Sequence, residues 1–460
     1  MKTDNTNLYA NAPISKAIIS LATPTIISQL ITVVYNMADT FFIGQMNDPN
    51  KVAAATLAMP PFLLLTGIAN LFGIGGSSLV SRSLGKGELK KAKSCSSFSF
   101  WSACILAFLY GILILIFHPV ILNILGCNKE TYDFCYDYIF WTITIGAVPT
   151  VLNACLAHII RSEGYSKIAG FGIAMGGILN IILDPIFIFV FRFEVAGAAI
   201  ATMLSNTISL TFLLVFVYRK RKELVITCNP KYYSLKQGIP KEVVMVGLPS
   251  CVIIIMGIFS NTVLNNLFSS YSNEAIAGMG IAKKIDTLAF AISNGMTQGV
   301  ISLIAYNYAA KNYKRMIKAI KTTFLYAFIL ALGGTVILFA GAAPVMKFFI
   351  DNSDTVAFGQ HFLRVICLTC PAISGTMIII TIFQAMGKKV QPLILSLLRK
   401  GSLDVPFMLL MNHIYGVNGI AWAVPISDML VLTASVILFI PTLKKLMKII
   451  KEDSLTASAS

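Results

Sequence analysis

The chain has 460 residues, of which 56% are apolar and 12% are charged, whereas an ordinary soluble domain is about 45–50% apolar and about 25% charged. With a mean hydropathy of +0.78, the composition excludes a disordered chain, a coiled coil and a disulfide scaffold. The formal net charge of +16 does not indicate a nucleic-acid partner here, because the basic residues flank apolar segments long enough to cross a bilayer.

Apolar segments separated by polar breaks predict twelve transmembrane helices and therefore an all-α integral membrane protein. In the first half of the chain the expected helices cover 15–45, 51–82, 94–117, 130–160, 166–191 and 195–219. In the second half they cover 242–271, 274–309, 318–346, 357–386, 390–412 and 418–443.

The positions of the basic residues predict the orientation. Most of them gather in loops on the side of the N-terminus, notably 82–93, 219–241 and 311–321, and a pair follows the fourth helix at Arg161 and Lys167. Basic loops stay in the cytoplasm. We therefore expect a multi-pass protein of the plasma (inner) membrane with both termini in the cytoplasm. The first helix is expected to be retained, because residues 1–14 are polar and no cleavage site follows a short apolar stretch.

The two halves of the chain resemble each other. Pro24 near the start of the first helix has a counterpart in Pro249, the loop that begins at Gly85 matches the one at Ala310, and Asp184-Pro185 resembles a segment that begins at Asp404. Such parallel repeats are related by an axis along the membrane normal. The expected domains are two six-helix lobes and two connecting or terminal segments: lobes 1–218 and 242–450, a basic cytoplasmic linker 219–241 and a polar tail 451–460.

Nine cysteines are scattered through apolar stretches, which is typical of small buried residues. Cys367 and Cys370 form a CxxC inside an expected helix, without a second pair or a nearby histidine, so we expect neither a zinc site nor a redox site. Cys127 and Cys135 flank an outer loop, and their pairing stays open as an alternative. The four histidines are isolated, so no metal site is expected beyond Na⁺.

Two acids lie deep in apolar helices of the first lobe. A carboxylate inside the bilayer costs a few kcal/mol or more, so Asp39 and Asp184 need a proton, a cation or a fixed partner. Asn180 and Asp184 are four residues apart and share a helix face, and Pro185 frees a backbone carbonyl and kinks the helix. This pattern favours an ion site. The alternative is a neutral acid that is hydrogen-bonded for packing.

The acids of the second lobe have basic neighbours in sequence. Asp404 follows Lys400 by four residues, so an ion pair within the helix is as good an interpretation as an ion site. Asp286 follows Lys283 by three residues and is expected to be a paired structural charge. Asp428 carries no assignment.

Several motifs resemble the multidrug and toxic compound extrusion (MATE) family, in its MepA-like branch. They are Pro24 followed by Asn36-Met37-Ala38-Asp39-Thr40 and Gly44, the Gly85-Lys86-Gly87 loop, and Asn180 with Asp184-Pro185. The resemblance covers essentially the whole chain. It implies an ion-coupling set of Asp39, Asn180, Asp184 and Thr202, with H⁺ or Na⁺ as the coupling ion and no other cofactor. One branch of the family carries coupling acids in its seventh and tenth helices, but 243–271 and 357–386 contain no Asp or Glu here. Coupling is therefore expected in the first lobe.

The expected function is an ion-coupled antiporter, not an enzyme, that exports amphipathic and mostly cationic compounds by alternating access, as a monomer in the lipid bilayer. The expected cavity residues are aromatic or amide groups within helices that form the lobe interface in the family: Tyr35, Asn36, Phe62, Tyr138, Asn153 and Gln298. One alternative is a lipid-linked oligosaccharide flippase, whose cavity would need several Arg and Lys residues to hold a pyrophosphate. A membrane-embedded enzyme would need an intramembrane nucleophile or histidine constellation.

Overall fold

The computed structural model describes residues 4–268, 270–350 and 352–459, and every regular element in these ranges is helical. The first half contains α1 (Asp4–Ala10), α2 (Ile14–Gly44), α3 (Pro49–Leu57), α4 (Met59–Gly85), α5 (Leu89–Ile124), α6 (Tyr132–Ile139), η1 (Phe140–Ile145), α7 (Ala147–Arg161), α8 (Ser166–Pro185), η2 (Ile186–Val190) and α9 (Glu194–Arg219). The second half contains η3 (Pro230–Tyr232), α10 (Ile239–Phe268), α11 (Asn273–Ala309), α12 (Tyr313–Ala340), α13 (Ala342–Phe349), α14 (Ser353–Cys367), α15 (Cys370–Ala385), α16 (Val390–Leu397), η4 (Leu398–Ser402) and α17 (Asp404–Ala459).

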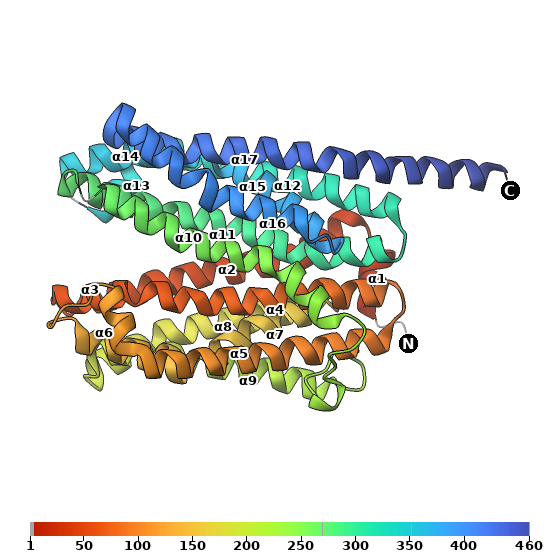
Figure 1. Ribbon diagram of the computed structural model, residues 1–460, viewed down its shortest axis with the longest axis horizontal. Helices are drawn as coiled ribbons and strands as arrows, with labels where there is room; N and C mark the ends of the chain where they lie inside the picture. Colours follow the sequence, from red (N-terminus) through yellow and green to blue (C-terminus); the bar gives the residue numbers. More distant parts are fainter. Residues whose placement is uncertain (1–3, 269, 351, 460) are drawn as a thin grey trace.

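The helices make twelve passes through the bundle. Ten helical segments of the described chain are long and apolar enough to span a membrane, and the pair Tyr132–Ile145 and Ala147–Arg161, bent by 51°, adds an eleventh. The last of the ten, Val390–Asp453, contains Gly416 with φ 59° and ψ −142°, outside the helical region. The chain reverses there, so that α16 and the long part of α17 run in opposite directions (Figure 1). This reversal gives the twelfth pass, as expected.

Several expected helices are broken. The segment expected over 51–82 is divided into α3 and α4, and the one expected over 357–386 is divided into α14 and α15. Both second helices carry a proline in their first turn, where a missing N–H is tolerated. Cys367 ends α14 and Cys370 begins α15, so the prediction that both cysteines lie inside one helix is wrong.

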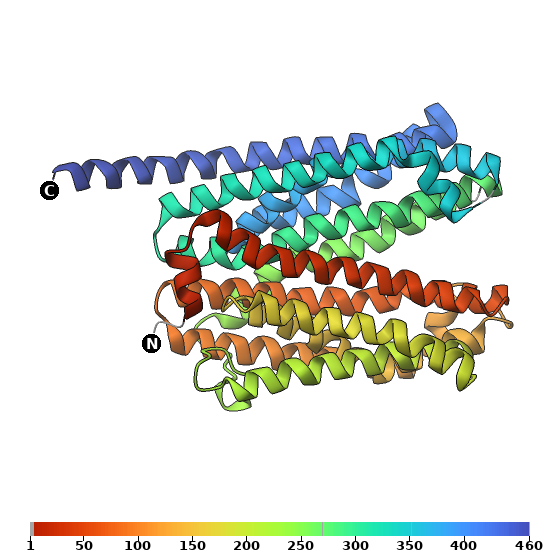
Figure 2. The ribbon, with the colours of Figure 1, turned by 180° about the vertical axis from the view of Figure 1, so that it is seen from behind.

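The helices form two groups. Helices α2 to α9 build one lobe and α10 to α17 the other, and the lobes touch mainly through α2 with α11 and α4 with α10 (Figures 1 and 2). Both chain termini lie at the same end of the bundle, which we call the terminal end. The segment expected as a polar tail from 451 onward continues α17 as a helix that extends beyond the bundle.

The two lobes pack backbone against backbone near the terminal end. A Cβ atom added at Gly295 of α11 would lie 2.5 Å from Ile26 Cα, and one at Gly299 would lie 2.6 Å from Ala22 Cα of α2. A Cβ atom added at Gly247 of α10 would likewise overlap the backbone carbonyl of Leu71 in α4. Glycine at these positions permits close approach of two backbones. The lobes are therefore tightly closed against each other near this end.

Polar contacts strengthen this closure. The Tyr9 hydroxyl of α1 donates to the Arg161 carbonyl of the first lobe (2.8 Å), while Asn307 and Arg315 of the second lobe donate to the Tyr9 carbonyl (3.1 and 2.7 Å). Between α4 and α10, Arg82 forms an ion pair with Glu242 (3.2 Å). The short helix α1 thus bridges both lobes at the terminal end.

Cys127 and Cys135, whose pairing the sequence leaves open, do not form a disulfide bond. The Cys127 thiol donates to Cys135 Sγ at 3.0 Å, and the Cys135 thiol donates to the Ala54 carbonyl at 3.3 Å. Both are free thiols, as are the other seven cysteines. The contact joins α6 to α3 at the end of the bundle opposite the termini.

Candidate functional site

A polar cluster within the first lobe joins three of the expected ion-coupling residues. The Asn180 amide of α8 donates to Asp184 Oδ1 and to Thr202 Oγ1 of α9, both at 3.1 Å. All three side chains are buried, and Asp184 is 0% exposed. Asn180 and Asp184 are one helical turn apart and meet on one face. Because α8 ends at Pro185 and continues as the π-helical turn η2, the regular backbone ladder is interrupted directly beside this acid.

Asp39 of α2 completes the expected set. Its carboxylate is buried and accepts a hydrogen bond from the Tyr138 hydroxyl of α6 at 3.1 Å. Tyr35, one turn before Asp39, interacts electrostatically with Asp39 and with Asp184. Helices α2 and α8 approach closely because Gly177 has no side chain, and a Cβ there would lie 2.9 Å from the Tyr35 ring. The fold therefore brings the two acids into one electrostatic cluster.

Three oxygen atoms of this cluster are buried without a hydrogen-bond partner: Asp39 Oδ1, Asn180 Oδ1 and Asp184 Oδ2. Among the described residues, neither acid has a basic side chain within ion-pair distance. Buried polar atoms normally have partners, and an unpaired buried carboxylate is strongly unfavourable. These oxygens can take up a proton or contribute to binding a hard cation, which prefers oxygen ligands.

A cavity of about 290 Å³ is lined mostly by helices of the first lobe and is completed by Ile254, Asn294 and Gln298 of the second lobe. Five of the six expected cavity residues belong to its lining: Tyr35, Asn36, Phe62, Asn153 and Gln298. Tyr138 is not part of this lining, because its hydroxyl is directed to Asp39 in the interior of the first lobe. Tyr35 contributes to the cavity wall and also interacts with both acids, so it connects the two features.

The cavity also contains two residues that sequence reasoning did not assign to it, His158 and Arg161 of α7. The pattern of basic residues predicts that Arg161 lies in a loop on the cytoplasmic side, but Arg161 ends α7 and is only 2% exposed. The sequence does contain one signal for this arrangement. His158 and Arg161 are three residues apart at the end of an apolar helix, a spacing that places both side chains on one face.

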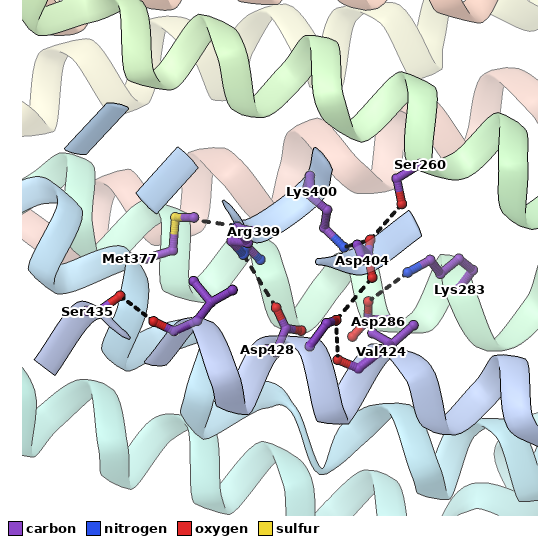
Figure 3. Close-up of polar contacts among 12 residues, drawn as sticks. Ser260, Lys283, Asp286, Met377, Arg399, Lys400, Asp404, Val424, Asp428 and Ser435 are labelled. Carbon is purple, nitrogen blue, oxygen red and sulfur yellow. Dashed lines mark hydrogen bonds and ion pairs between the residues drawn. The ribbon is translucent and has the colours of Figure 1, made fainter. Parts of the chain in front are cut away.

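In the second lobe, buried acids are paired with basic side chains (Figure 3). Asp404 accepts hydrogen bonds from Ser260 (2.6 Å), Lys400 (3.1 Å) and Ser427 (3.2 Å). Of the two interpretations left open for Asp404, this geometry corresponds to the ion pair within the helix.

Two further ion pairs lie in the same region of the second lobe. Arg399 faces Asp428 at 3.6 Å, and Lys283 faces Asp286 at 3.8 Å, which is the pairing expected for Asp286 (Figure 3). The buried acids of the second lobe are therefore compensated by bases, whereas those of the first lobe are not.

Two helical lobes around a central cavity, with uncompensated acids inside one lobe, define a membrane transporter with internal parallel repeats. A family model described as MatE matches the chain twice, over residues 24–186 and 249–410. The chain therefore belongs to the multidrug and toxic compound extrusion (MATE) family, and the expected resemblance is confirmed.

Similar proteins agree with this assignment. The chain is 30% identical over 439 residues to the multidrug export protein MepA of Staphylococcus aureus strain MSSA476, covering 95% of this chain and 96% of that protein. It is also 30% identical over 431 residues to MepA of Staphylococcus haemolyticus, covering 93% and 94%. A solved structure described as the outward-facing conformation of a multidrug resistance MATE family transporter has the same fold, with a TM-score of 0.91 at 24% identity over 97% of this chain and 100% of that one.

Proposed function

We propose that this protein is an antiporter of the plasma membrane that couples the inward movement of H⁺ or Na⁺ to the export of amphipathic, mostly cationic compounds. Export is the activity named in the relatives of similar length. The protein acts as a monomer by alternating access, with the terminal end in the cytoplasm. It needs no cofactor besides the coupling ion, and it is not an enzyme.

The contrast between the two lobes carries the proposal. The first lobe contains two buried acids with unpartnered oxygens and no basic partner among the described residues, whereas Asp404 of the second lobe is paired with Lys400. A paired acid has little to gain from an added cation, while an unpaired one is neutralised by it. The coupling ion therefore binds at Asp39 and Asp184, with Asn180 and Thr202 positioning Asp184.

The cavity connects ion binding to export. Neutralising Asp39 and Asp184 changes the charge beside Tyr35, which is part of the cavity wall. Binding of a cationic compound in the cavity is favoured when the acids are charged and disfavoured when an ion has neutralised them. The ion and the substrate therefore compete. Pro24 lies within α2 and removes one of its backbone hydrogen bonds, so this helix can bend as the lobes move.

The experiment that tests the proposal uses purified protein in liposomes loaded with a fluorescent lipophilic cation. A pH gradient and a Na⁺ gradient are applied separately while efflux of the dye is followed. We expect efflux to follow one of the two gradients and to stop when that gradient is collapsed. Efflux at the same rate with neither gradient would overturn ion coupling, and no transport of any cationic dye would overturn the substrate class.

A further inference from the structure

An arginine without a counter-charge lies in the wall of the central cavity. Arg161 ends α7, is 2% exposed and belongs to the cavity lining. Among the described residues, no carboxylate forms an ion pair with its guanidinium. Glu163 is close in sequence, but it accepts a hydrogen bond from the Val225 backbone N–H at 2.6 Å. An arginine keeps its charge in proteins, so a buried positive charge stands unpaired at the cavity.

The partners of the guanidinium leave one edge unused. Arg161 Nη1 donates to Gln298 Oε1 at 3.3 Å and lies 3.4 Å from His158 Nδ1. The other two nitrogens, Nε and Nη2, are buried without a hydrogen-bond partner. These two nitrogens form the same side of the planar guanidinium, which is the edge that binds a carboxylate through two parallel hydrogen bonds. Because both nitrogens are buried here, a carboxylate in the cavity reaches them when the side chain turns toward the cavity.

We propose that Arg161 binds the anionic group of amphipathic substrates that carry both a positive and a negative charge, with a carboxylate as the group that fits its free edge. The inference rests on the proposed function, because it assigns a specificity-determining residue to the same cavity. A zwitterion finds the guanidinium of Arg161 in one part of the wall. It finds Tyr35, which lies one turn before Asp39 on α2 and interacts electrostatically with Asp39 and Asp184, in another part.

A purely conformational role of Arg161 makes a different prediction. Gln298 belongs to α11 of the second lobe, so the bond from Arg161 also joins the lobes. If joining the lobes were the whole role, removing the guanidinium would alter the transport of every substrate by a similar factor. Binding of an anionic group would instead alter only those substrates that carry one.

A matched pair of dyes separates the two roles. One probe is a xanthylium dye with a free benzoate, which is a zwitterion, and the other is the methyl ester of the same dye, which is only a cation. Binding to the full-length protein in detergent is measured by fluorescence anisotropy, and efflux is measured in liposomes. In Arg161→Gln we expect the affinity for the zwitterion to fall by at least about tenfold relative to that for the ester.

A second variant keeps Arg161 and replaces its hydrogen-bond partner Gln298. Gln298→Glu places a carboxylate of nearly the same shape beside the guanidinium, so it should weaken binding of the zwitterion even if Arg161→Gln does not fold. Asn294→Ala is the control, because Asn294 lines the same cavity one turn earlier on α11 and its replacement adds no charge. That variant should change the affinities for both dyes by similar factors.

The outcomes are distinguishable. Equal changes for both dyes in Arg161→Gln and in Gln298→Glu would overturn the proposal and leave the joining of the lobes as the role of Arg161. Failure of the wild-type protein to bind the zwitterion would overturn it as well. If the wild-type protein binds both dyes but neither gradient drives efflux of the ester, the proposed function fails while the binding comparison still tests Arg161.

Discussion

The close contact between the lobes predicts a specific effect of adding one methyl group. In Gly247→Ala the new Cβ would overlap the backbone carbonyl of Leu71, which cannot rotate away as a side chain can. Helices α4 and α10 must therefore separate. Overpacking of this kind costs about 1–3 kcal/mol, which corresponds to a shift of about 5- to 150-fold away from the conformation closed at the terminal end.

Spin labels measure this shift directly. Lys90 of the first lobe and Lys311 of the second are exposed at the terminal end, and cysteines in their place carry the labels on a cysteine-free background. We expect a population with a longer distance between the labels in Gly247→Ala. Gly257→Ala is the matched control, because it lies on the same helix with no atom within 4 Å of the added Cβ. Identical distance distributions in the two variants would refute the reasoning.

Three other predictions concern pH, topology and selectivity. Burial raises the pKa of Glu163, in the loop after α7, to about 7, above the unfolded value of about 4.3. Its folded state therefore binds a proton more readily, and the stability that it contributes is lost as the pH rises through about 7. In detergent, the melting temperature should fall less between about pH 5 and about pH 8 for Glu163→Gln than for the wild type. Equal falls of the melting temperature would contradict the role of this group. Single cysteines in 82–93 or 219–241 should react with an impermeant label only from the cytoplasm, and labelling of both from outside would invert the topology. Unrelated lipophilic cations should compete for efflux, because the cavity combines aromatic and amide groups; preference for a single anionic metabolite would exclude this substrate class.

Local features of the site could be predicted from the sequence. Asn180 and Asp184 are one turn apart on the same helix, so their contact follows from helix geometry alone. The pairing of Lys283 with Asp286 follows in the same way. Thr202 lies on another helix, and only the resemblance to the family placed it beside Asn180.

Features that depend on distant segments could not be predicted. Arg161 follows an apolar segment, where a basic residue normally marks a loop, and its burial depends on contacts such as that with Gln298 of the other lobe. The pairing of Arg399 with Asp428 joins residues on opposite sides of the reversal at Gly416. Tyr138 has an aromatic ring suited to a cavity, but the position of Asp39 on a separate helix determines where its hydroxyl points.

The central claim is that coupling takes place at the acids of the first lobe and not at those of the second. Asp184→Asn keeps the volume of the side chain but fixes it as neutral, whereas the double variant Lys400→Gln with Asp404→Asn removes the Lys400–Asp404 ion pair of the second lobe without leaving a buried lysine unpaired.

The most direct test compares gradient-driven dye efflux of these two variants in liposomes, with gradient-free dye binding as the measure of folding. We predict that Asp184→Asn binds the dye but loses gradient-driven export, and that the double variant retains it. Normal gradient-driven export by Asp184→Asn, together with its loss in the double variant, would contradict the account and move the coupling site to the second lobe.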